Sequence, residues 1–150
     1  MNGFIGDFLG NTTIWVAVLS WFIAQAIKIT VDIIRTRELK LSLLFSSGGM
    51  PSSHSSFVSA AATVIGLQSG FYSDNFAVAV VIALVVMHDA AGVRRAAGTH
   101  AMIINTIIKN VENSGVVIDK KLKELLGHSP IEVATGAILG VLIALLAVRP

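Results

Sequence analysis

The hydrophobic residues of this chain gather into four long runs separated by short polar stretches. The runs cover about 13–34, 55–72, 76–87 (continuing into His88 and Asp89) and 130–148. The first, second and fourth runs have about the 17–25 residues with which a helix crosses a bilayer, and the shorter third run starts a span that continues past it. The pattern predicts an all-α, polytopic membrane helix bundle with about four transmembrane helices.

A polar insert of about residues 100–128 separates the third and fourth runs. Within it, "AMIINTIIKNVENS" has apolar residues at helical spacing, and "DKKLKELLG" is typical of a short amphipathic helix that ends at Gly127. We expect short interfacial helices here, lying on the membrane surface or covering a site. Residues 1–150 then form a single integral-membrane domain.

The fourth run has a well-marked start. Ser129 is suited to the N-cap position, Pro130 to the first helical position and Glu132 to the acidic position of a capping box. Further along, Gly136 and Gly140 form a G-x-x-x-G pair, which lets two helices pack closely in lipid. The sequence therefore predicts a helix from about 130 that packs tightly against a neighbour.

Composition supports a membrane protein. Charged residues make up 13% of the chain, against roughly 25% in soluble domains. The absence of cysteine excludes thiolate catalysis and cysteine-based metal sites. "MNGFIGDFLGN" contains no Lys or Arg, unlike the start of a cleaved signal peptide, so we expect the first run to remain as an anchor.

The positive charges predict an orientation. If all four runs cross, ten of the eleven Lys and Arg residues fall on one side and only Arg149 on the other. The positive-inside rule places the richer side in the cytoplasm and both termini outside. We expect a bacterial cell membrane or an organelle membrane.

Four polar clusters fall at helix ends on this predicted cytoplasmic side. They are Lys28, Asp32 and Arg35 on one face of the first helix; the loop "GGMPSSH", ending in His54; "HDAAGVRR", with Asp89, Arg94 and Arg95; and "GHSPIE", with His128 and Glu132. The clusters are spread over more than 100 residues of sequence, yet the topology brings them to one end of the bundle. This convergence is typical of a site.

The residue types in these clusters suit phosphate chemistry. Lysine and arginine neutralise phosphate, and arginine contacts it in a bidentate way. The backbone N–H groups of residues 48–53, together with a helix start, can cradle an anion. One histidine can act as nucleophile when a carboxylate holds its other nitrogen, while a second histidine protonates the leaving oxygen.

Three stretches resemble the type 2 phosphatidic acid phosphatase superfamily, which includes the vanadium haloperoxidases. "PSSH" at 51–54 resembles its P-S-G-H motif. Lys28 and Arg35 have the spacing of its K-x6-R-P motif, and "GHSPIEVATGAILG" is similar to its third motif. Together with "HDAAGVRRAAG", the pattern resembles the divergent branch of small membrane proteins in this superfamily, over residues 28–140.

The chain departs from the superfamily pattern at several positions. Thr36 replaces a proline, Ser53 a glycine and Glu132 the usual aspartate. The arginine of S-R-x5-H does not directly precede His128, because Arg94 and Arg95 stand more than thirty residues upstream. An alternative reading, Arg94-x5-His100, has Ile104 where the acid belongs. We therefore favour His128 with Glu132 as the third motif.

The resemblance implies a membrane-embedded phosphatase that hydrolyses a lipid phosphomonoester or diphosphate through a phosphohistidine. It implies that His128 attacks, Glu132 orients it and His54 protonates the leaving group. The predicted phosphate-binding residues are Lys28, Arg35, Ser52, Ser53, Arg94 and Arg95, with support from Asp89 and His100. We expect no metal and no cofactor, a membrane lipid or lipid phosphate as partner, and no nucleic acid. A homo-oligomer is compatible with the sequence.

Simpler interpretations stand beside these roles. Glu132 also fits a pure capping role, His54 a serine-rich cap, and Lys28 a side chain reaching to the interface. Asp89 fits pairing with the arginines better than catalysis. The alternative function is a non-catalytic membrane protein of the same fold that binds an anionic lipid or a partner. The pair of histidines, His54 and His128, favours the enzyme, because lipid binding alone needs neither.

Overall fold

A computed structural model describes residues 2–37, 49–112, 122 and 127–148. These residues form helices, with no strand among them. The helices are α1 (Asn2–Leu9), α2 (Thr12–Thr36), α3 (Ser53–Ser69), α4 (Asp74–Ala91), α5 (Val93–Glu112) and α6 (Pro130–Ala147). The predicted all-α membrane helix bundle is confirmed.

Short polar residues start four of the helices. A side-chain oxygen of the N-cap residue accepts a hydrogen bond from a backbone N–H of the first turn, which satisfies a donor that the helix itself cannot pair. The N-caps are Asn11 for α2, Ser52 for α3, Ser73 for α4 and Ser129 for α6. The predicted capping box of Ser129 and Glu132 is present.

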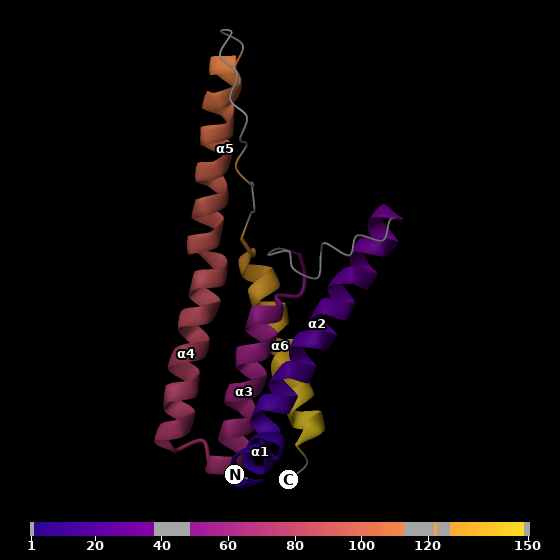
Figure 1. Ribbon diagram of the computed structural model, residues 1–150, viewed down its shortest axis with the longest axis vertical. Helices are drawn as coiled ribbons and strands as arrows, with labels where there is room; N and C mark the ends of the chain where they lie inside the picture. The colour runs from indigo at the N-terminus through magenta and orange to yellow at the C-terminus, as the bar shows by residue number, and fades with distance from the viewer. Residues whose placement is uncertain (1, 38–48, 113–121, 123–126, 149–150) are drawn as a thin grey trace.

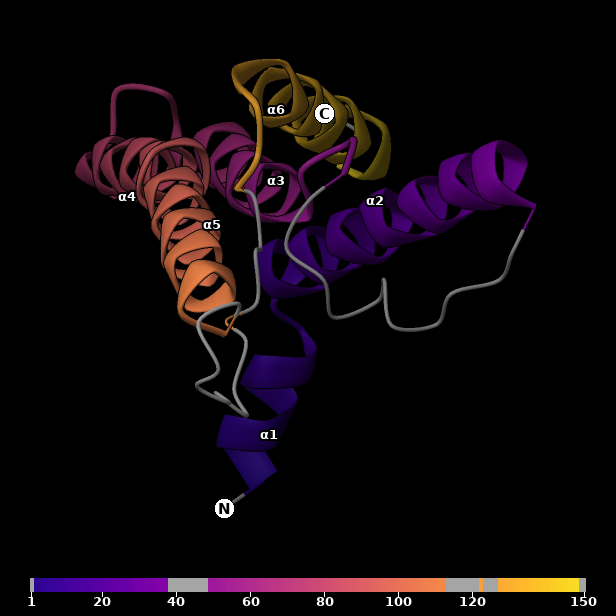
Figure 2. The same ribbon diagram turned by 90° about the horizontal axis from the view of Figure 1, so that it is seen from above.

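Helix α3 lies at the centre of the bundle, in contact with α2, α4 and α6 (Figures 1 and 2). Helix α2 also contacts α6, whereas α4 lies on the other side of α3. The largest group of buried apolar residues lies where α2, α3 and α6 meet: Val16, Ala60, Val64, Ile143 and Ala144. Small and β-branched residues therefore form the core, and the large apolar residues are left to face lipid.

The closest packing is the seam between α3 and α6. A Cβ atom added at Gly136 would overlap the carbonyl oxygen of Ser52, and one added at Gly140 would overlap that of Ser56. The backbones thus approach to a distance that only glycine allows. The predicted role of the G-x-x-x-G pair is confirmed.

A buried hydrogen bond joins α3 to α2. The Ser20 and Ser56 hydroxyl oxygens lie 2.6 Å apart, and Ser20 Oγ also donates to the Ser56 carbonyl oxygen at 3.1 Å. Both residues are fully buried. In an apolar environment such a pair must satisfy itself, because no water is present to replace either partner.

The predicted spans differ from the helices in detail. Three stretches are long and apolar enough to cross a membrane, at residues 12–34, 74–111 and 130–147. The predicted second span, 55–72, is α3, which has 17 residues, stands at the lower limit of crossing length and is enclosed by its neighbours. It stops at Ser69 because Gly70 adopts a φ of +90°, a conformation that breaks a helix.

The insert begins differently from the prediction. We expected a polar segment from about residue 100 with short helices, but α5 starts at Val93, directly after Gly92, and has 20 residues. It continues beyond the end of α4, away from α3 and α6 (Figure 1). The first twelve residues of "AMIINTIIKNVENS", 101–112, are the C-terminal part of α5, while its last two residues and most of "DKKLKELLG" lie outside the described residues.

The two ends of the bundle carry different elements. Helix α1 and the C-terminal end of α6 lie at one end, and the starts of α3 and α6 lie at the other (Figure 1). The predicted polar clusters therefore share the end at which α3 and α6 start.

Helix α1 was not predicted. The Trp15 indole N–H donates to the Leu9 carbonyl oxygen at 2.8 Å and holds the joint between α1 and α2.

Candidate active site

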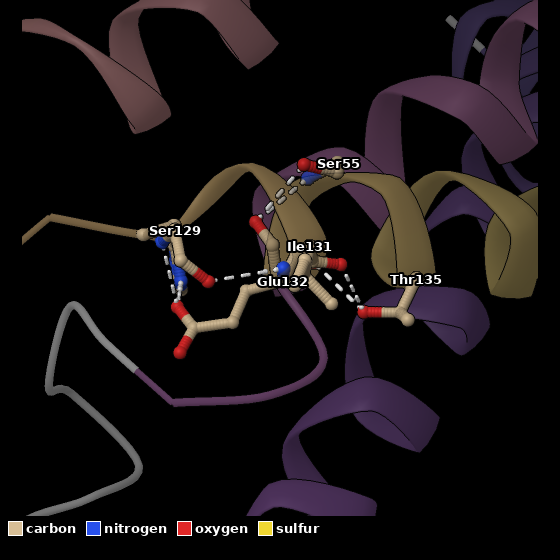
Figure 3. A network of polar contacts seen from close by, with 7 residues as sticks. Ser55, Ser129, Ile131, Glu132 and Thr135 are labelled. Atoms are coloured by element: carbon tan, nitrogen blue, oxygen red, sulfur yellow. Dashed lines mark hydrogen bonds and ion pairs between the residues drawn. The ribbon is translucent and has the colours of Figure 1, made fainter.

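The candidate site is built on the first turn of α6. Ser129 Oγ accepts a hydrogen bond from Glu132 N at 3.3 Å, and Glu132 Oε2 accepts one from Ser129 N at 3.1 Å. Figure 3 shows the Glu132 side chain folded back over this turn toward Ser129. The capping box thereby fixes the direction of the Glu132 carboxylate.

The same carboxylate oxygen contacts His128. His128 Nδ1 lies 3.0 Å from Glu132 Oε2, and the His128 side chain is buried while that of Glu132 is partly exposed. A carboxylate at Nδ1 orients the imidazole ring and stabilises its cationic form. This contact leaves Nε2 as the nitrogen that can attack an electrophile.

His54 lies beside His128 although 74 positions separate them in sequence. Their ring centroids are 6.3 Å apart, with the planes inclined at 62°. His54 is in the first turn of α3, and this turn is tied to α6 because Ser52 N donates to the Glu132 carbonyl oxygen at 2.9 Å. The α3–α6 seam therefore sets the distance between the two histidines.

The serines of "PSSH" are buried around the start of α3. Ser52 Oγ accepts hydrogen bonds from Ser55 N at 3.4 Å and from Ser55 Oγ at 3.0 Å, so it caps the helix. Ser53 occupies the first helical position and is 3% exposed. Backbone N–H groups at such a helix start favour an anion.

Lys28 comes to the same region from α2. It is 4% exposed, and it lies close enough to the Glu132 carboxylate for the two charges to attract each other. Gly49, with a φ of +84°, lies over the methylene stem of Lys28: an added Cβ atom would be 3.4 Å from its Cγ. A buried lysine in a membrane-spanning helix is costly and is typical of a functional position.

The end of α4 completes the surroundings of His128. His128 N donates to the Ala90 carbonyl oxygen at 3.0 Å, and Ala90 is buried. Asp89, the residue before it, is partly buried and lines a hollow of about 420 Å³ with Leu84, Val85 and His88. Asp89 is therefore next in sequence to the residue that His128 contacts, while its supporting role stays a prediction.

One predicted residue, His100, is not brought into this group, and the side chains of three others are not described. His100 is exposed on α5, and among the described helices α5 contacts α4 alone. His100 therefore does not lie beside Glu132, either as a supporting residue or as the histidine of the alternative third motif. Arg35, Arg94 and Arg95 belong to the ends of α2 and α5, but their side chains lie outside the described part of the chain. Their phosphate contacts remain predictions.

Other buried polar residues were not predicted as part of the site. Gln25, one turn before Lys28 on α2, is 4% exposed, and Ser20, Ser55 and Ser56 are fully buried. The signal for Gln25 was its position inside an apolar run, where an amide needs a polar neighbour. The serines carried no such signal, because serine is common in membrane helices of every environment.

The arrangement combines the parts that phosphoryl transfer to histidine requires. A buried histidine is oriented by a carboxylate, a second histidine stands beside it, and a buried cation and a helix start lie nearby. Fixed cations and backbone donors stabilise charge on transferring phosphoryl oxygens.

Comparison with known proteins agrees with this description. The profile of a family described as "Divergent PAP2 family" matches residues 9–143. The chain is 40% identical over 153 residues to an "Uncharacterized membrane protein YuiD" of Bacillus subtilis (strain 168), which covers 93% of this chain and 95% of that protein. No solved structure matches. The match extends across α2, α3, α4 and most of α6, including every residue of the site, and the chain therefore belongs to the divergent PAP2 family.

Proposed function

We propose that this membrane protein is a phosphatase that hydrolyses a lipid phosphomonoester or diphosphate through a phosphohistidine on His128. The observation that carries the proposal is the contact of buried His128 with Glu132 at 3.0 Å, beside His54. A helix cap requires Glu132 but neither histidine. Two histidines in mutual contact at a buried helix junction suit proton and phosphoryl transfer.

In the first step, His128 Nε2 attacks phosphorus. An N–P bond forms as the P–O bond to the leaving group breaks, and protonated His54 gives its proton to the leaving oxygen. The Glu132 carboxylate stabilises the positive charge that develops on the His128 ring, because its oxygen already contacts Nδ1. Lys28 and the first-turn N–H groups of α3 stabilise the phosphoryl oxygens.

In the second step, neutral His54 takes a proton from a water molecule whose oxygen attacks phosphorus. The N–P bond breaks, inorganic phosphate leaves, and His128 returns to its neutral form with His54 protonated again. Each histidine thus ends the cycle in its starting state. The predicted phosphate contacts of Arg35, Arg94, Arg95, Ser52 and Ser53 would bind the same oxygens in both steps.

The position of the site supports a lipid substrate. His54, His128 and Glu132 lie at the ends of helices that are long and apolar enough to cross a membrane, or that pack directly against such helices. The ends of membrane-spanning helices lie near the depth of lipid headgroups. The distribution of Lys and Arg favours the cytoplasmic leaflet as the source of the substrate.

The test is phosphate release by the purified protein in detergent from a panel of lipid phosphates and diphosphates, with a chelator present. We expect release by the wild-type protein, complete loss in His128→Ala, and a loss of about 10²–10⁴-fold in His54→Ala, the usual contribution of general acid–base catalysis. His88→Ala is the matched control, because His88 is an exposed histidine on α4.

A comparison of acid-quenched and base-quenched samples tests whether the intermediate is a phosphohistidine. A phosphoryl group on histidine survives base and is lost in acid, and it should be absent in His128→Ala. If the folded protein released no phosphate from any substrate yet bound phosphatidic acid vesicles equally well with and without the two histidines, the non-catalytic alternative would replace this proposal.

A further inference from the structure

Helix α5 is too long to belong to the membrane crossing of α4. Helix α4 has 18 residues, or about 27 Å at 1.5 Å per residue, which already matches a hydrocarbon core of about 30 Å. The 20 residues of α5 add about 30 Å more in nearly the same direction (Figure 1). Most of α5 must therefore lie outside the hydrocarbon core.

Nevertheless, α5 carries an apolar face that a helix in water would not keep. Ile103, Ile104, Ile107 and Val111 fall within about 100° of one another around the axis, and each is at least 36% exposed. The opposite face presents Thr106 and Lys109, both exposed. The helix is thus strongly amphipathic.

Nothing in the described part of the chain covers this face. Among the described helices, α5 contacts only α4. Leu122 contacts α5 on its other side: the Asn105 side chain donates to the Leu122 carbonyl oxygen at 2.8 Å and accepts from Leu122 N at 2.9 Å. Asn105 lies near Lys109 on the polar face of the helix, so this contact leaves the isoleucines exposed.

The junction of α4 and α5 allows a change of direction. Helix α4 ends at Gly92, and α5 begins at the next residue. Glycine between two helices is a common position for a kink. Val81, Ile82 and Val85 are exposed on α4, which is long and apolar enough to cross a membrane, so the apolar surface of α5 continues a surface suited to lipid.

We propose that α5 rests on the membrane surface, turning at Gly92 so that its apolar face enters the boundary between headgroups and acyl chains. Amphipathic helices with large apolar residues on one face and lysine on the other bind bilayers in this way, most strongly those that contain anionic lipid. The proposal is independent of the phosphatase activity. It gives the bilayer, rather than a second protein, as the partner of this face.

The absence of cysteine makes the test direct, because single-cysteine variants need no background changes. Ile104→Cys and Ile107→Cys place a spin label on the apolar face. Met102→Cys is the matched control, two residues from Ile104 but on the opposite face of the same helix. The proteins are reconstituted in phosphatidylglycerol and phosphatidylethanolamine vesicles, and collisions of the label with oxygen and with a nickel chelate are measured.

We expect labels at 104 and 107 to collide with oxygen and to lose collisions with the nickel chelate, and the label at 102 to do the reverse. Equal nickel collisions at all three positions would place the apolar face in water and overturn the proposal. Loss of both kinds of collision, with spin–spin broadening at 104 and 107, would also overturn it by showing that a second copy covers the face.

Discussion

Helices α3 and α4 have 17 and 18 residues and were predicted as the same kind of element, yet they occupy opposite environments. Eight residues of α3 are buried, four of them serines and the others alanine, valine and glycine. In α4 only Ala83 and Ala90 are buried, while its valines, isoleucine and leucine are mostly exposed. The more polar helix is in the centre of the bundle.

The difference follows from the solvent. Lipid tails are as apolar as leucine, so burying a large apolar side chain gains little, whereas small residues let backbones approach and polar groups find partners. Serine, alanine and glycine therefore mark the interior, and large apolar residues mark the lipid face. Helix α3 therefore differs from α4 in having smaller and more polar residues, and these are the residues that favour the interior of a membrane protein.

The largest effect should come from filling the α3–α6 seam. Gly136→Ala brings a Cβ atom into the Ser52 carbonyl oxygen, and we expect a loss of about 3 kcal/mol, at the upper end of overpacking changes. The measurement is the midpoint of thermal unfolding in detergent, followed by circular dichroism. Gly6→Ala in α1 is the control, since an added Cβ atom meets nothing within 4 Å there. Equal midpoints for the two variants would contradict the close packing.

A second pair applies one chemical change to both helices. Val64 on α3 is 0% exposed and Val81 on α4 is 59% exposed. We expect Val64→Ala to lower the free energy of unfolding by about 1–2 kcal/mol through the cavity it leaves. Val81→Ala should change it by less than about 0.5 kcal/mol. Denaturation by a titrated harsh detergent measures both, and a larger effect at Val81 would show that α4 is covered by another chain.

The N-caps of α4 and α6 allow a separation of stability from activity. Ser73→Ala and Ser129→Ala each remove a cap, and we expect each to cost about 1 kcal/mol. Only Ser129→Ala should also reduce phosphate release, because Ser129 holds the turn that directs Glu132. Assays on both variants at a temperature where each is folded make the comparison. Equal activities would mean that Glu132 does not depend on its cap.

The smallest effect concerns the hydrogen bond between α2 and α3. Ser56→Ala removes the contact with Ser20, and interhelical hydrogen bonds in membranes contribute on average about 0.6 kcal/mol. Ser59→Ala is the control, because its hydroxyl only reaches the Met87 sulfur at 4.0 Å. The unfolding midpoints in one detergent should differ by a small but measurable amount, with Ser56→Ala the lower. A lower midpoint for Ser59→Ala than for Ser56→Ala would show instead that the serine contact between α3 and α4 contributes more to stability.

The sequence predicted the parts of the structure that depend on local pattern. The bounds of α2 and α6 lie within about two residues of the predicted spans, because apolar runs and N-caps are written in consecutive positions. The approach of His128 to Glu132 also follows from local spacing, since four residues around a helix start bring two side chains together.

Features set by packing were not predictable in this way. The central position of α3 depends on which helices pack against its serines and against the glycines of α6. The sequence alone does not show which helices are neighbours. The continuation of α4 into α5 was missed because "HDAAGVRR" was taken as the end of the third span, whereas a helix begins at Val93 and includes these arginines. Ser20 and Ser56 form a hydrogen bond although 36 positions separate them in sequence. Hydrophobic periodicity within one helix cannot predict a contact between two helices.

Glu132 links two properties of the chain through a single oxygen atom. Because Oε2 both closes the first turn of α6 and holds His128, a mutation at this position would weaken the start of α6 as well as the proposed chemistry. A relative that had lost the proposed reaction would therefore still be expected to keep this glutamate for the helix start. The presence of Glu132 in a relative is for that reason no sign, by itself, that the relative is an enzyme.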